Sequence, residues 1–210
     1  MIVGRYADRA MQILPVTDDT LHVAAALIRD GGVVAHATET CYGLACDMTN
    51  AVAVERVFRI KQRPFTQPVS ALFPQVEAAK AWVLWNARAE ELAQKFLPGP
   101  LTLILPIAKD VALFPTPAGG ATVGVRVSPH PVSRQLAELA GRPISTTSAN
   151  VHGQPSPYDA QTIAAQYDGA GDAPDLVLDS GTLPTTPPST ILDLSGPGGD
   201  RALRTGSVPV

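Results

Sequence analysis

The sequence predicts an α/β domain in which helices flank a twisted, largely mixed β-sheet. Short apolar runs typical of buried strands alternate with helix-like segments along the whole chain. Hydrophobic residues make up 45% of the 210 residues, which is enough to bury a full core. A chain of this length favours one domain over two, and it shows no internal repeat.

The first half of the chain predicts two helices, each followed by a strand. The segment Leu21 to Asp30 has a helical apolar content, and the glycine pair after it would end the helix. Asn50 can cap a second helix. This helix must end near Arg63, because Pro64 disfavours helical geometry in the residue before it. The strands expected here are Val33 to Ala37 and Val69 to Phe73.

The second half predicts three more helices between extended segments. Asn86 can cap a helix that ends before Pro98, and Gly141 would end a helix that begins at Pro131. Residues 156–159 read Ser-Pro-Tyr-Asp, which is typical of a third helix start with a hydroxyl cap and proline at the first position. The extended segments expected are Leu101 to Ile107, Thr122 to Val127, Pro143 to Thr147, Asp175 to Leu178, Thr190 to Leu194 and Ala202 to Arg204.

Charge and composition argue against several classes of protein. The formal net charge is -3, whereas a dedicated nucleic-acid binder usually carries a basic surplus. No run approaches the roughly 20 apolar residues that span a bilayer. Cys41 and Cys46 are too few for a disulfide framework and lack the histidines of a zinc site. We therefore expect a cytoplasmic protein without a membrane segment and without a protein-held metal.

Two pairs of polar residues stand where a ligand could bind. Thr38 and Thr40 follow a buried strand, the place where ligands bind in open α/β sheets, although both are also ordinary strand formers. Lys61 and Arg63 stand one residue apart before a proline and could grip neighbouring phosphates. The same two cations could instead balance the dipole at a helix end on a solvated face.

A third cluster combines hydroxyl and amide groups. Residues 145–150 read Ser-Thr-Thr-Ser-Ala-Asn, which suits short contacts to a polar ligand but is also common in turns. Ser189 and Arg204 flank the strand expected at residues 190–194. The sequence has neither a Walker-type phosphate loop nor a Gly-x-Gly-x-x-Gly fingerprint nor a Gly-x-Ser-x-Gly elbow. Common nucleotide and hydrolase motifs are thus missing.

Taken in order, these clusters resemble the YrdC/Sua5 family of threonylcarbamoyl-AMP synthases. The resemblance extends from about Leu21 to Val208, and it depends on the order of the motifs. These motifs are Gly31-Gly32-Val33-Val34, Thr38-x-Thr40-x-Tyr42-Gly43-Leu44, Lys61-x-Arg63-Pro64, Pro98-Gly99-Pro100-Leu101-Thr102, Val125-Arg126-Val127, Ser148-Ala149-Asn150 and Ser189-Thr190-Ile191-Leu192-Asp193.

The resemblance implies a fold and a reaction. The fold is a YrdC-like catalytic domain over residues 21–210 with a large concave groove, after an N-terminal extension over residues 1–20. The reaction joins L-threonine, bicarbonate (or carbon dioxide) and ATP into threonylcarbamoyl-adenylate and releases pyrophosphate, as the first step of N6-threonylcarbamoyladenosine (t6A) formation at position 37 of tRNA. Mg²⁺ would accompany ATP, and a separate tRNA threonylcarbamoyltransferase complex would receive the product. A weak contact with tRNA itself is a further expectation.

The resemblance also assigns roles to individual residues. Lys61 and Arg63 would be the catalytic pair that holds the ATP phosphates, with Ser148 and Asn150 on the nucleotide side. Arg204 and Arg126 would add positive charge near the phosphates. The residues expected around threonine and its carbamate are Thr38, Thr40, Thr122 and Ser189.

The chain departs from the family pattern in three places. Residues 36–40 read His-Ala-Thr-Glu-Thr where relatives usually have Tyr-Pro-Thr-Asp-Thr, so both threonines and an acid are kept but the proline is Ala37. Ser128 also stands where relatives usually have proline, and Leu72 stands where many relatives have a histidine that contacts threonine. The alternative to the synthase is an RNA-binding module of the same fold without adenylation activity. That alternative predicts salt-sensitive RNA binding and no release of pyrophosphate.

Overall fold

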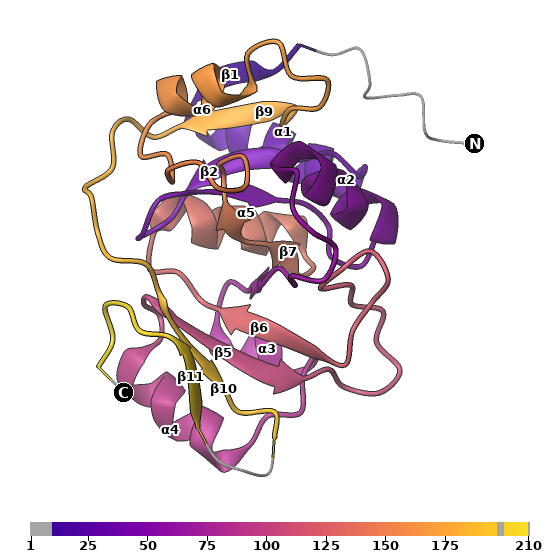
Figure 1. Ribbon diagram of the computed structural model, residues 1–210, viewed down its shortest axis with the longest axis vertical. Coiled ribbons are helices and arrows are strands. Elements are labelled where there is room, and N and C mark those ends of the chain that lie inside the picture. The colour runs from indigo at the N-terminus through magenta and orange to yellow at the C-terminus, as the bar shows by residue number, and fades with distance from the viewer. Residues whose placement is uncertain (1–9, 197–199, 210) are drawn as a thin grey trace.

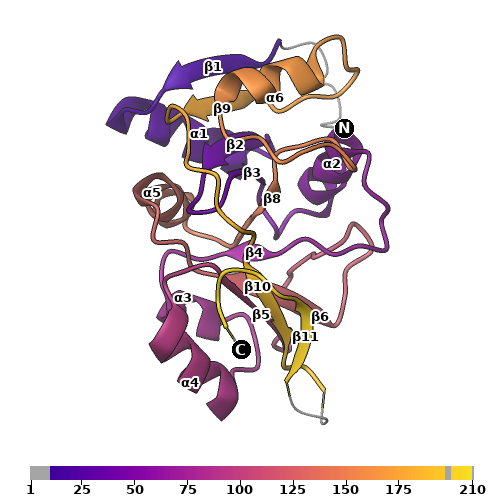
Figure 2. The same ribbon diagram turned by 60° about the vertical axis from the view of Figure 1, so that its left-hand side comes forward.

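The computed structural model describes residues 10–196 and 200–209, and within them it confirms a mixed α/β fold. The strands form two mixed sheets rather than the single sheet expected from the sequence. In Figures 1 and 2 the sheets lie one above the other, with α3 and α4 beside one and the remaining helices around the other. The helices are α1 (Asp18–Arg29), α2 (Ala51–Lys61), α3 (Val76–Lys80), α4 (Ala87–Phe96), α5 (Pro131–Ala140) and α6 (Ala160–Tyr167).

The first sheet has the strand order β1-β9-β2-β3-β8. Its first three strands are parallel, and β3 and β8 each pair antiparallel with the preceding neighbour in this order. Every residue of β2 is buried, because α1 and α5 cover one face of the sheet and α2 covers the other. The strands are β1 (Gln12–Pro15), β9 (Leu176–Asp179), β2 (Val34–Ala37), β3 (Tyr42–Ala45) and β8 (Thr147–Ser148).

The second sheet has the strand order β11-β10-β5-β6-β4-β7 and again mixes parallel and antiparallel pairs. Leu101, Leu103 and Leu105 alternate with Thr102, Ile104 and Pro106 along β5 and belong to the main core. The strands are β11 (Arg201–Arg204), β10 (Thr190–Asp193), β5 (Leu101–Pro106), β6 (Thr122–Arg126), β4 (Ala71–Leu72) and β7 (Ile144–Ser145).

The chain passes from the second sheet to the first within a few residues. β7 belongs to the second sheet and β8 to the first, and only Thr146 separates them. The Thr146 N–H donates to the carbonyl of Ser70 before β4, while β8 pairs with β3. The hydroxyl-rich segment singled out in the sequence therefore lies at the junction of the two sheets.

Four elements differ from the sequence-based expectation. β1 lies inside the segment assigned to an N-terminal extension and pairs with β9, so residues 12–20 are part of the fold, whereas residues 1–9 lie outside the described residues. β3 and α3 were not predicted. Helix α6 does not begin at Ser156, because the side chain of Asp159 is its N-cap and accepts from Thr162 N at 2.6 Å.

Asn50 is the cap predicted for α2, and its side chain accepts from Val52 N at 3.0 Å and Ala53 N at 3.4 Å. We expect Asn50→Ala to lower the free energy of unfolding by about 1 kcal/mol, because two helix N–H groups lose their acceptor. Urea denaturation measures this loss. Gln75→Ala is the matched control, since Gln75 precedes α3 without a side-chain cap bond and its replacement should leave stability nearly unchanged. Equal losses in both variants would contradict the capping role.

Candidate functional site

A cavity of about 290 Å³ lies where the two sheets meet. Its walls come from the turn after β2, the loop after α2, the ends of β5 and β6, the β7–β8 segment and the chain around β10 and β11. Three guanidinium groups and many hydroxyls face it, and no carboxylate is among the residues that line it in the described chain. This composition suits a ligand with several negative charges.

Most of the predicted site residues meet at this cavity, but in two layers. A first layer lines the cavity, and a second layer lies buried directly behind it. The lining residues among those predicted are Thr40, Arg63, Arg126, Ser148, Ser189 and Arg204, and the buried ones are Thr38, Lys61 and Asn150.

The structure does not bring Thr122 or Leu72 to the cavity wall. Thr122 begins β6, whose last residue Arg126 is the one that reaches the cavity. A strand rises about 3.3 Å per residue, so these two residues lie roughly 13 Å apart along β6. Leu72 is buried in the core beside α1 and α5. The threonine-contacting role expected of Thr122 therefore has no support in the geometry.

Thr38 shapes the turn that presents Thr40 and Cys41 to the cavity. Its Oγ1 donates to the carbonyl of Cys41 at 2.7 Å and accepts from Thr40 N at 3.1 Å. Its hydroxyl also lies 3.0 Å from that of Thr40. Thr38 is only 3% exposed, so its contribution is to hold the turn rather than to touch a ligand in this arrangement.

Lys61 is the last residue of α2 and is only 1% exposed. Its Nζ donates to the carbonyl of Ser148, and to the carbonyl and the side-chain oxygen of Asn150 at 2.8 and 3.3 Å. Burial, together with the charge of Arg63, lowers the pKa of Lys61 to about 7. The lysine thus fixes the segment after β8 from behind and places a titrating amine under the cavity wall.

The loop after α2 carries Arg63 to the cavity. Gln62 adopts a left-handed conformation with φ 51°, which ends the helix immediately after Lys61. Arg63 then donates from Nε to the carbonyl of Gln67 at 2.8 Å and from Nη2 to that of Pro68 at 3.2 Å. The guanidinium braces its own loop while it faces the cavity.

Arg204 and Ser189 form one unit at the opposite wall. Arg204 donates from Nε to the Ser189 carbonyl and from Nη2 to Ser189 Oγ, both at 2.8 Å. Ser189 Oγ also lies 3.0 Å from the hydroxyl of Thr102 on β5. Burial and the charge of Arg126, which lines the same cavity, lower the pKa of the Arg204 guanidinium.

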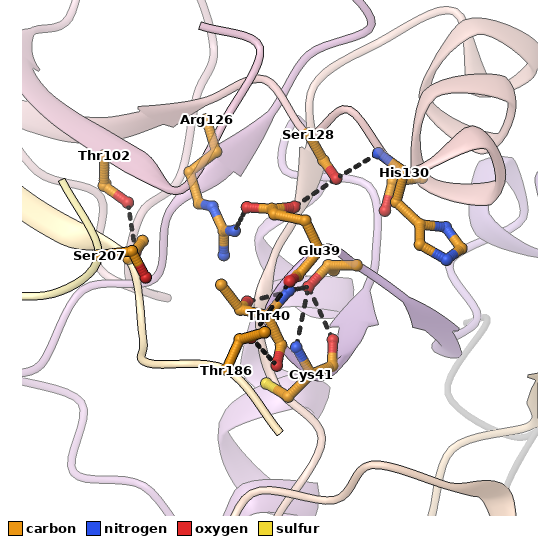
Figure 3. Close-up of polar contacts among 12 residues, drawn as sticks. Glu39, Thr40, Cys41, Thr102, Arg126, Ser128, His130, Thr186 and Ser207 are labelled. Carbon is orange, nitrogen blue, oxygen red and sulfur yellow. Dashed lines mark hydrogen bonds and ion pairs between the residues drawn. The ribbon is translucent and has the colours of Figure 1, made fainter. Parts of the chain in front are cut away.

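Glu39 is a site residue that the sequence did not single out. Figure 3 shows its carboxylate between Arg126 and Ser128, and it pairs with Arg126 Nη2 through one oxygen and with Ser128 Oγ through the other. A signal was present in the sequence, because a charged residue between two threonines after a buried strand is unusual. Without coordinates, however, its partner could not be named.

The segment 181–189, which connects β9 to β10, is docked against the cavity. The hydroxyl of Tyr42 donates to the carbonyl of Gly181 and accepts from Ser180 N, each at 2.8 Å. Thr186 Oγ1 donates to the carbonyls of Glu39 at 3.2 Å and Thr40 at 3.1 Å. These contacts hold the segment across the turn that carries Thr40.

A larger cavity of about 640 Å³ lies elsewhere, between the α3 region and α5. None of the predicted site residues lines it, and its walls include Phe73, Trp82 and Val127. The smaller cavity is the better candidate site because it gathers the cations and hydroxyls, and size alone does not identify a chemistry.

Residues 26–206 match the protein-family model described as telomere recombination, which covers Sua5, YciO and YrdC proteins. The chain belongs to the Sua5/YciO/YrdC family. A Pyrococcus abyssi protein named threonylcarbamoyl-AMP synthase is 38% identical over 178 residues, which are 83% of this chain and 51% of the relative. The chain thus spans about half the length of that relative.

A second relative is nearer in length, and a solved structure matches the fold. An Idiomarina loihiensis protein, also named threonylcarbamoyl-AMP synthase, is 33% identical over 83% of this chain and 93% of its own length. The crystal structure of Pyrococcus abyssi Sua5 complexed with L-threonine superimposes with a TM-score of 0.83 and 34% identity, covering 95% of this chain and 57% of that chain. The family resemblance and the fold expected from it are therefore confirmed.

Within the described residues, no helix combines the length and apolar character needed to cross a bilayer. No group of three or more His, Cys, Asp or Glu side chains that could hold a metal ion occurs there either.

Proposed function

We propose that this family member makes threonylcarbamoyl-adenylate from L-threonine, bicarbonate and ATP, with release of pyrophosphate. The observation that carries the proposal is the cavity between the two sheets, where Arg63, Arg126 and Arg204 face the same space without a carboxylate among its lining. The relatives named for this synthase activity support the choice of substrates. The structure titled as a complex with L-threonine supports an amino-acid site in this fold.

The chemistry needs positioning and charge neutralisation more than acid–base catalysis. The amine of threonine condenses with bicarbonate to form a carbamate, with loss of water. One carbamate oxygen then attacks the α-phosphorus of ATP. The bond from this phosphorus to the bridging oxygen of the β-phosphate breaks, and pyrophosphate leaves with the electron pair. The carbamate is already anionic, so cations and hydroxyls on a rigid frame are sufficient.

We assign the residues to two ends of the cavity. Arg63 and Ser148 would contact the triphosphate, with Lys61 and Asn150 behind them. Thr40 and Ser189 would lie beside threonine and its carbamate, and Arg126 and Arg204 would offset charge at the reacting centre. Thr38 would act through the turn that it holds.

Mg²⁺ fits this site only as a companion of ATP. The described lining offers hydroxyl and carbonyl oxygens but no carboxylate, so the phosphate oxygens would supply the negative ligands that Mg²⁺ prefers. When bound, the ion would neutralise charge on the leaving pyrophosphate. Ser148, which lines the cavity at the end assigned to the phosphates, would offer its hydroxyl oxygen there.

The proposed product must pass to a partner that uses it. An adenylate is labile, so we propose that a tRNA threonylcarbamoyltransferase complex in the cytoplasm accepts it directly. A weak contact of tRNA with this chain is part of the same proposal. An acidic chain with a net charge of -3 makes that contact secondary to binding of the nucleotide.

The proposal is tested by following pyrophosphate release with ATP, Mg²⁺, bicarbonate and L-threonine, omitting each component in turn. We expect release that requires both threonine and bicarbonate. Serine in place of threonine tests the amino-acid selectivity in the same assay. Folded protein that binds RNA in a salt-sensitive way and releases no pyrophosphate would instead support the RNA-binding module.

The buried amine of Lys61 predicts that ATP binding takes up a proton. The pKa of Lys61 is about 7 in the free protein, and nearby phosphates favour the charged form and raise it. Above pH 7 binding therefore recharges the amine, and ATP affinity weakens as the pH rises from 7 to 9. Isothermal titration calorimetry at pH 8, in buffers of different ionisation enthalpy, measures the uptake. Equal uptake in Lys61→Met would show that another group titrates.

A further inference from the structure

Arg126 is a buried cation at the cavity wall, and only 10% of its side chain is exposed. Burying a charge costs desolvation free energy, and a nearby opposite charge is needed to offset this cost. Among the described residues, its only ion pair is with Glu39, whose side chain is 12% exposed. Its Nε is buried and has no hydrogen-bond partner in the described chain. The orientation of the guanidinium therefore depends largely on Glu39.

Glu39 is itself fixed by a second contact. One carboxylate oxygen accepts from Arg126 Nη2 and the other from Ser128 Oγ. Ser128 Oγ in turn accepts from His130 N at 3.1 Å, at the start of α5. Figure 3 shows this row of groups leading from Arg126 through Glu39 to Ser128 and His130. Both oxygens are thus used, and the carboxylate cannot turn toward the cavity without breaking a bond.

The contact between Glu39 and Arg126 joins the two sheets. Glu39 belongs to the turn between β2 and β3 of the first sheet, and Arg126 ends β6 of the second. The backbone carbonyl of Glu39 also accepts from Thr186 of the segment that crosses the turn. A second cation, Arg204, lines the same cavity as Arg126. Without the carboxylate, two guanidiniums would repel one another across the cavity.

We infer that Glu39, held by Ser128, is the positioning residue that aims the Arg126 guanidinium into the cavity. The effect of Glu39 on catalysis rests on the proposed function. The contact between Glu39 and Arg126 is independent of that function. Glu39 acts on the substrate only through Arg126, with which it forms one functional unit. Its loss should therefore matter only while Arg126 is present.

A double-mutant cycle tests this dependence. Glu39→Ala and Arg126→Ala should each lower kcat/KM for threonine-dependent pyrophosphate release, roughly 10²-fold at most, because a small misplacement of a binding group is that costly. The double variant should be no slower than Arg126→Ala alone. Glu55→Ala is the matched control, because it removes a carboxylate from the exposed ion pair with Arg59 and should leave the rate unchanged.

A spectroscopic measurement on the full chain keeps this test separate from the proposed function. In ¹⁵N NMR, the Arg126 guanidinium signals, identified by their loss in Arg126→Lys, should broaden or exchange faster in Glu39→Ala. If the Glu39→Ala variant does not fold, the Glu39→Gln variant is measured in its place. If the wild type releases no pyrophosphate but the signals depend on Glu39, the function fails and the positioning inference stands. Independent effects of the two substitutions on the rate, with unchanged signals, would overturn the inference.

Discussion

Lys61→Met is expected to abolish most threonine-dependent pyrophosphate release, with a loss of about 10²–10³-fold, which is typical when one stabilising donor is removed from an active site. The methionine keeps the length and apolar stem of lysine but cannot donate a hydrogen bond. The carbonyls of Ser148 and Asn150 would lose their shared donor, and the phosphate end of the cavity would lose a cation. The steady-state rate of pyrophosphate release measures the effect.

The control for Lys61→Met is Lys95→Met on α4. Lys95 is an exposed lysine paired with Glu91 at 2.7 Å, away from the cavity, so its replacement should leave the rate unchanged. Circular dichroism of both variants verifies folding. A Lys61→Met protein that folds and keeps half of the wild-type rate would refute the assigned role of the lysine.

Asp175→Ala is expected to produce the largest loss of stability, about 3–5 kcal/mol in the free energy of unfolding. Asp175 is 7% exposed and pairs with both terminal nitrogens of Arg56 on α2. It also accepts from Val33 N at 2.7 Å, just before β2. The substitution leaves a buried guanidinium without this carboxylate and removes the tie between α2 and the first sheet. Urea denaturation measures the loss.

A nearby aspartate provides the comparison for Asp175→Ala. Asp172 pairs with Arg59 at 3.2 Å, and both side chains are well exposed, so Asp172→Ala should cost less than about 1 kcal/mol. The two residues lie on the same loop and face the same helix, and burial is the main difference between them. Similar losses of unfolding free energy in the two variants would show that the buried pair of Asp175 and Arg56 stabilises the fold no more than the exposed pair does.

Elements with a strong local signal could be predicted from the sequence. Helix α5 occupies Pro131–Ala140 as expected, because proline begins it and Gly141 ends it at φ 68°. Asn50 and Asn86 both cap the helices predicted for them. β1 and β3 were missed because their strand character depends on long-range pairing, of β1 with β9 and of β3 with β2 and β8, rather than on a strong local signal.

The division into two sheets could not be predicted, since it depends on long-range pairing. The extended run expected at residues 143–147 is two short strands in different sheets. The structural reason for Gly43 likewise depends on a residue far away in the sequence. Gly43 lies inside β3, where an added Cβ would lie 3.3 Å from the Thr147 carbonyl oxygen, so it is needed for close packing of β8.

The site could be predicted as a set of residues but not as a geometry. Motif order indicated Arg63, Ser148 and Arg204, and all three line the cavity. It gave no sign that Lys61 lies buried behind them or that Thr122 lies at the far end of its strand. Glu39 was overlooked because its role depends on Arg126, which is far away in the sequence.

The central claim is that the cavity between the sheets joins a carbamate of threonine to the adenylyl group of ATP. Mass spectrometry of a reaction with ¹³C-labelled bicarbonate tests it most directly, because it detects the product itself. We expect a threonylcarbamoyl-adenylate that carries the label, is absent when threonine is omitted, and is strongly reduced when Lys61→Met replaces the wild type. Pyrophosphate released without any labelled adenylate would contradict the claim, since ATP would then be cleaved without transfer to the carbamate.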